Sequence, residues 1–162
     1  MSDPTKYDKI AHHIYDFMGR NDLWNEHHKL YGYEPPAIPS THLCRETATF
    51  GLFVLESVGE TGWRLQFGEV EFDADDGVPL DITDTEGYGV PNEKITSAPH
   101  VWLTNDRSKY NIDFTADQFG RLFLPAEAGP LVSKTSDLFY TIWDEAQDWS
   151  NDPQIVAAAE RW

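Results

Sequence analysis

The chain has 162 residues, of which 40% are hydrophobic, 14% aromatic and 25% charged, a composition typical of one globular domain with its own core. The chain has 12 Lys and Arg residues and 28 Asp and Glu residues. The resulting net charge of −16 makes direct binding to nucleic-acid phosphates unfavourable. The charge suits a basic partner or substrate. It also simply keeps a protein soluble, and that is the interpretation we favour.

Cysteine content and hydropathy exclude further classes. Cys44 is the only cysteine, so an intrachain disulfide and a zinc site of four thiolates are both ruled out. No apolar run approaches the roughly 18 residues of a membrane span, and the polar start differs from a secretory signal. We therefore expect a cytoplasmic protein that has no membrane partner.

The N-terminal segment, residues 1–39, is predicted to be helical. Asp3 and Pro4 are typical of a helix start, and apolar residues then recur at helical spacing until Gly19: Tyr7, Ile10, Ile14, Phe17 and Met18. Aromatic residues and prolines follow over 21–39, which indicates short helical turns and then a rigid extended connection.

A second helix is predicted after this connection. Ser40 or Thr41 can cap it, and an apolar stripe continues to a stop at Gly59, which places Cys44 in the first turn. Apolar residues then alternate on either side of Gly68, where the phase changes, so we expect a strand with a bulge or two short strands. An acidic loop over 73–92 comes next.

Residues 99–104 and 109–115 are predicted to form a hairpin with a four-residue loop, 105–108. Placing the apolar residues on one face sets Leu103 opposite Tyr110. In that register His100 lies opposite Asp113 on the other face, where Cβ atoms of paired residues are about 5 Å apart. A carboxylate at that distance can hold the imidazole in one tautomer.

The remaining chain predicts short strands over 121–124 and 131–133, then two helices. The first rests on helical spacing of Leu138, Phe139, Ile142 and Trp143, and the second begins at Pro153. Altogether we expect a single α+β domain over 1–162, with a core of 40–135 between the N-terminal segment and C-terminal helices of 136–162.

Cys44, His100 and Asp113 together suggest a catalytic triad. A helix N-terminus and a neighbouring imidazolium both favour the thiolate form of a cysteine. If His100 reaches Cys44, the thiolate is the nucleophile, the imidazole a general base and then acid, and Asp113 the orienting carboxylate. The Cys44 N–H is a candidate oxyanion donor. Each residue alone has an ordinary structural explanation, such as a buried small hydrophobe for the cysteine.

At these residues the sequence resembles the transglutaminase-like branch of the papain-like cysteine enzymes. That family has a cysteine at a helix start, then His-x-Trp on one strand and Asp-x-Thr on the next, and this chain has Cys44, then His100-Val101-Trp102, then Asp113-Phe114-Thr115. The resemblance covers roughly residues 40–118. His42-Leu43 before the cysteine and Phe114 in place of a common proline depart from the family pattern.

The resemblance implies a papain-like core, with the catalytic helix packed on a small antiparallel sheet. It also implies a thiol hydrolase or acyltransferase that acts on a peptide or protein amide or isopeptide through a thioester acyl-enzyme, with hydrolysis and acyl transfer both open. We predict Cys44, His100 and Asp113 as catalytic residues, with Trp102 and Gln118 lining the substrate site. No cofactor or metal is expected, since the histidine pairs and the acidic loop lack metal-ligand spacing.

A second hypothesis comes from a different class. The chain would be a non-catalytic acidic interaction or decoy protein that binds a basic partner, and its triad-like residues would be vestigial. The reactivity of Cys44 distinguishes the two hypotheses, because only the enzyme needs a thiolate at a pH near 6.5.

Overall fold

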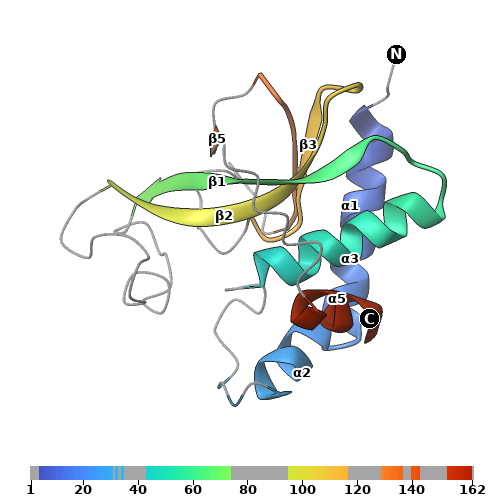
Figure 1. Ribbon diagram of the computed structural model, residues 1–162, viewed down its shortest axis with the longest axis vertical. Coiled ribbons are helices and arrows are strands. Elements are labelled where there is room, and N and C mark those ends of the chain that lie inside the picture. Colours follow the sequence, from blue (N-terminus) through green and yellow to red (C-terminus); the bar gives the residue numbers. More distant parts are fainter. Residues whose placement is uncertain are drawn as a thin grey trace.

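The computed structural model describes residues 4–30, 32, 34, 43–73, 95–116, 129–136, 140–142 and 153–161. Within these residues the fold is α+β: helices pack on an antiparallel sheet with the strand order β4-β3-β2-β1-β5 (Figure 1). The helices are α1 (Pro4–Arg20), α2 (Leu23–Leu30), α3 (Cys44–Ser57) and α5 (Pro153–Arg161). The strands are β1 (Trp63–Asp73), β2 (Ile95–Asn105), β3 (Tyr110–Asp113), β4 (Leu131–Lys134) and β5 (Tyr140–Ile142).

Helix α3 carries Cys44 as its first residue, so the predicted position of the cysteine is confirmed. The predicted cap is wrong, because the N-cap residue is Leu43 and its apolar side chain makes no capping hydrogen bond. The predicted stop at Gly59 is confirmed. Gly59 has a φ of 80°, and the Glu60 N–H donates to the Leu55 carbonyl at 2.9 Å, a hydrogen bond typical of a helix that ends in a left-handed residue.

The β2–β3 hairpin has a four-residue loop as predicted, but the loop is 106–109 and the register differs by two residues. Leu103 lies opposite Ile112, not Tyr110. The cause is Asn105, whose Oδ1 accepts the N–H groups of Arg107 and Ser108, both at 3.0 Å, and so starts the turn one residue later. A shift of two residues leaves every side chain on its predicted face.

Strand β1 is continuous, so the predicted bulge at Gly68 is wrong. It pairs with β2 without interruption from Trp63 to Asp73, and Gly68 lies directly opposite His100. The apolar phase changes because both faces of this part of the sheet are covered: Trp63 joins the main core, whereas Val70 is buried on the opposite face. Before Gly68, Trp63 faces the main core, whereas after it Val70 faces the opposite side of the sheet.

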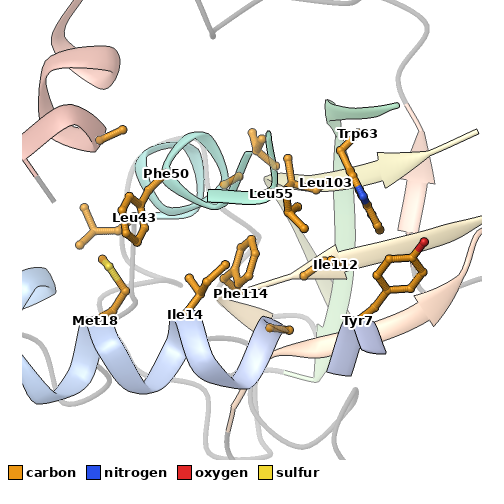
Figure 2. Packing of buried hydrophobic residues seen from close by; sticks show 14 of the residues in the cluster. Tyr7, Ile14, Met18, Leu43, Phe50, Leu55, Trp63, Leu103, Ile112 and Phe114 are labelled. Atoms are coloured by element: carbon orange, nitrogen blue, oxygen red, sulfur yellow. The ribbon is translucent and has the colours of Figure 1, made fainter. Parts of the chain in front are cut away.

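The main core lies between α1, α3 and one face of the sheet (Figure 2). Tyr7, Ile14 and Met18 extend from α1 toward this core, at the spacing predicted for one face of a helix. Phe114 occupies the space between α1 and α3, and its ring lies so close to Gly51 that a Cβ there would come within 2.2 Å of it. This close approach packs α3 against the sheet and directs its N-terminus toward the middle of the strands (Figure 1).

The C-terminal part departs from prediction in one place. Residues 140–142 form β5, which pairs with the edge of β1, whereas the sequence spacing predicted a helix there. Alternation of Tyr140 and Ile142 around a β-branched Thr141 suits a strand, and the open edge of β1 provides the partner. Helix α5 and strand β4 are confirmed. The acidic loop, the strand predicted over 121–124 and Gln118 lie outside the described residues.

Candidate active site

The N-terminus of α3 places Cys44 at the centre of the candidate site. The Cys44 side chain is partly exposed, whereas Leu43 before it is buried. The first helical hydrogen bond runs from the Thr47 N–H to the Leu43 carbonyl at 3.0 Å. The Thr47 hydroxyl in turn accepts a hydrogen bond from the indole N–H of Trp24 at 3.0 Å, which anchors this end of α3 to α2.

His100 stands in the middle of β2 and is only 1% exposed. Its Nε2 lies 2.8 Å from Oδ2 of Asp113, so the structure brings these two predicted residues together. Cys44 lies close enough to His100 for its side chain to raise the pKa of the ring. Because Nε2 is engaged by the carboxylate, Nδ1 is the ring nitrogen that remains for the thiol.

The electrostatic balance at His100 favours the imidazolium. Burial alone lowers its pKa, but the Asp113 charge, the hydrogen bond to Asp113 and the contact with Cys44 outweigh burial and raise the pKa of His100 to about 10. The ring is therefore protonated at neutral pH. In that state Nε2 donates to the carboxylate, and Nδ1 carries a proton as well.

Asp113 is held by several groups besides His100. Its Oδ1 accepts the backbone N–H of Thr115 at 3.0 Å, with the Thr115 hydroxyl at 3.5 Å, so the Asp-x-Thr spacing fixes the carboxylate locally. Its Oδ2 also accepts a hydrogen bond from the Tyr140 hydroxyl at 2.9 Å. Asp113 is 1% exposed, and these donors compensate for the burial of its charge.

Tyr140 is a residue of the site that sequence reasoning missed. The helix predicted around Leu138 and Ile142 concealed it, whereas strand alternation of Tyr140, Thr141 and Ile142 was the available signal. Burial raises the pKa of Tyr140 well above its usual range, and the Asp113 charge adds to the effect. The hydroxyl thus stays a donor.

Trp102 shares the His100 side of β2, as predicted, and is 1% exposed. Its ring stacks on Tyr140 with centroids 4.3 Å apart and on His100 with centroids 6.1 Å apart. Trp102 thus supports the imidazole and the phenol from one side. Its predicted contact with substrate stays a prediction.

Comparison with family models, curated proteins and solved structures finds no match to this chain. Among the residues that the structure describes, no cluster of three or more His, Cys, Asp or Glu side chains is arranged to hold a metal ion. None of the described helices combines the length and apolar character needed to cross a membrane. The candidate site therefore has to be interpreted from its own geometry.

Proposed function

We propose that the chain is a thiol hydrolase or acyltransferase that acts on an amide or isopeptide carbonyl through Cys44. The observation that carries this proposal is that a thiol and a carboxylate both act on one imidazole: His100 Nε2 lies 2.8 Å from Asp113 Oδ2, and Cys44 is near enough to raise the pKa of the ring. In such an arrangement the imidazole can move a proton between the sulfur and the substrate while the carboxylate holds the ring.

The first half of the proposed reaction forms a thioester. The Cys44 thiolate attacks the carbonyl carbon, and the carbonyl electrons move onto oxygen. As the tetrahedral intermediate collapses, the C–N bond breaks and the His100 imidazolium gives its Nδ1 proton to the leaving nitrogen. An imidazolium that is already formed at neutral pH suits this step, because the proton donor is in place before substrate binds.

The second half returns the enzyme to its starting state. Neutral His100 takes a proton from water, whose oxygen attacks the thioester carbonyl, and the sulfur leaves as thiolate beside the regenerated imidazolium. The products are a carboxylic acid and the amine released earlier. If an amine replaces water, the same steps give acyl transfer.

The N-terminus of α3 offers a site for the developing oxyanion. The N–H groups of a first helical turn have no intrahelical acceptor, and the Leu43 side chain caps none of them. The Cys44 N–H is next to the sulfur and is the donor we propose for the oxyanion.

The order of elements supports a papain-like or transglutaminase-like core. The cysteine begins a helix that packs on the sheet, the histidine follows on β2, and the aspartate lies on the neighbouring antiparallel strand β3. A peptide or protein amide is the proposed substrate, and the net charge of −16 favours a basic one.

Alkylation kinetics test the proposal directly, because Cys44 is the only thiol in the chain. We expect iodoacetamide to modify the protein at pH 6.5 at least about tenfold faster than it modifies glutathione. His100→Gln should remove this advantage. His27→Gln, at another buried histidine, is the matched control and should leave the rate unchanged.

Labelling with a library of electrophilic peptide amides, followed by mass mapping, should then place the adduct on Cys44 and identify the acyl group preferred. A Cys44 that reacts like glutathione in the wild type and in both variants would contradict the enzyme. It would favour the acidic interaction protein instead.

A further inference from the structure

Tyr140 shares the carboxylate that holds His100, and this arrangement extends the proposed site to a third strand. We infer that Tyr140 is a positioning residue, which fixes the Asp113 carboxylate and moderates its attraction for the His100 proton. The inference rests on the proposed function, since it assigns Tyr140 a part in controlling the Cys44–His100 pair.

Asp113 accepts hydrogen bonds at both of its carboxylate oxygens. An ionised carboxylate only accepts, so the Tyr140 hydroxyl must donate its proton to Oδ2. The same Oδ2 accepts from His100 Nε2, at 2.8 Å against 2.9 Å for the tyrosine. Oδ1 is held separately by Thr115. Tyr140 and His100 therefore compete for the negative charge of one oxygen.

The strands and rings fix the tyrosine in this place. Strand β5 pairs with β1, with Tyr140 opposite Val70, so the backbone of the tyrosine is anchored to the sheet. Its ring stacks on Trp102, and the planes of Tyr140 and His100 differ by only 16°. The Tyr140 hydroxyl thus approaches Asp113 from a rigid platform.

The groups that surround His100 come from four elements among the described residues. Cys44 approaches from α3, Asp113 from β3 and the Tyr140 hydroxyl from β5. On β1 the residue opposite His100 is Gly68, which has no side chain. Tyr140 is the neutral donor in this set.

The consequence concerns the pH range in which the imidazolium persists. A donor to Oδ2 compensates part of the negative charge, so removing the hydroxyl leaves a carboxylate that attracts the His100 proton more strongly. The imidazolium should then persist to higher pH. The orientation of the carboxylate should also loosen, which should slow alkylation of Cys44 at neutral pH by up to about tenfold.

Two alkylating reagents report the imidazolium without knowledge of the substrate. Iodoacetate carries a negative charge and iodoacetamide does not. The rate with iodoacetate divided by the rate with iodoacetamide at Cys44 is therefore high while His100 is charged, and it falls when His100 loses its proton. We expect Tyr140→Phe, which keeps the ring and its stacking on Trp102, to move the midpoint of this fall upward by up to about one pH unit.

Two further proteins complete the design. Tyr110→Phe removes the hydroxyl of a tyrosine on β3 and should leave the midpoint where it is in the wild type. Difluorotyrosine at position 140 donates more strongly and should shift the midpoint downward, which keeps the test decisive if Tyr140→Phe folds poorly by near-UV circular dichroism.

The outcomes separate the two proposals. A wild-type Cys44 that reacts like glutathione overturns the proposed function itself. A fast wild-type Cys44 whose midpoint is unmoved by folded Tyr140→Phe, or by difluorotyrosine, leaves the thiol chemistry standing and overturns the role of Tyr140. Opposite shifts from the two replacements support it.

Discussion

His27 and His100 lie in two regions of the molecule, and both are buried, with 3% and 1% of their surfaces exposed. His27 is on α2, where Arg161 of α5 approaches its Nδ1 at 3.5 Å. His100 is on β2, where the Asp113 carboxylate lies 2.8 Å from its Nε2. One histidine thus has a cation beside it and the other an anion.

Burial acts in the same direction on both rings, because it disfavours the charged form and so lowers the pKa. At His27 the charge of Arg161 adds to burial and the pKa falls to about 4. At His100 the carboxylate overcomes burial and the pKa rises to about 10. The comparison teaches that burial by itself keeps a histidine neutral at neutral pH, and that an adjacent carboxylate is what allows a buried histidine to act as a proton donor there.

The largest expected effect comes from Asp113→Asn, which removes the anion beside His100. Breaking a buried charge pair at one partner should lower the free energy of unfolding at pH 7 by about 3 kcal/mol. It should also remove the fast alkylation of Cys44, since the imidazole becomes neutral. Urea unfolding followed by tryptophan fluorescence, together with the iodoacetamide rate, measures both effects.

The pH dependence of stability gives the same variant a second readout. In the wild type the folded pKa of His100, about 10, exceeds its ordinary value of 6.5, so the folded state binds more protons and stability is lost as pH rises from 6.5 toward 10. In Asp113→Asn this alkaline contribution should disappear.

Asp106→Asn is the matched control for this experiment. Asp106 is exposed and pairs with Arg64 at 3.0 Å, so its replacement should cost less than about 1 kcal/mol. An alkaline slope that persists in Asp113→Asn would mean that Asp113 does not set the charge of His100.

The sequence predicted the His100–Asp113 contact through the faces of the strands, although the predicted register was two residues away. Side chains alternate with a period of two, so such an error moves residues along a face without exchanging faces. His100 and Asp113 are therefore diagonal neighbours whose side chains still meet, at 2.8 Å. The place of Cys44 in the first turn of a helix was predictable because the apolar stripe that follows it is local in sequence, whereas the exact first residue was not, since Leu43 and not Ser40 or Thr41 is the N-cap.

Tyr140 and the charge states of the two histidines were not predictable in this way. Strand β5 exists because β1 has an open edge, and a three-residue strand carries little pattern of its own. The proximity of Arg161 to His27 joins residues 134 positions apart. Such contacts depend on how α2 and α5 pack, which hydropathy spacing does not encode.

A smaller effect is expected at His27. Its folded pKa of about 4 lies below the ordinary 6.5, so the unfolded state binds more protons in this window and stability is lost as pH falls from 6.5 toward 4. His27→Gln should reduce this acid loss by on the order of 2 kcal/mol, measured as the difference between urea unfolding curves at pH 7 and pH 4.5.

His13→Gln replaces an exposed histidine on α1 and serves as the control, since its stability profile should follow that of the wild type. If His27→Gln and the wild type lose stability in parallel on acidification, the buried ring is not the group that titrates.

The smallest effect should follow from Arg161→Gln, which removes the cation from His27 and leaves its burial intact. An arginine only donates hydrogen bonds, so its contact with Nδ1 requires that this nitrogen be unprotonated and that the neutral ring carry its proton on Nε2. Without Arg161 the pKa of His27 should rise, but only by less than about one unit, because the arginine is exposed and its charge is screened by water and salt.

Nuclear magnetic resonance of the imidazole carbon-bound protons measures this change in the pKa of His27. Arg64→Gln, at an exposed arginine on β1, is the control and should leave the pKa of His27 unchanged. Raising the salt concentration should bring the wild type toward the variant. If neither Arg161→Gln nor salt changes the pKa of His27, burial accounts for the whole lowering of that pKa. The contrast with His100 would then rest on Asp113 alone.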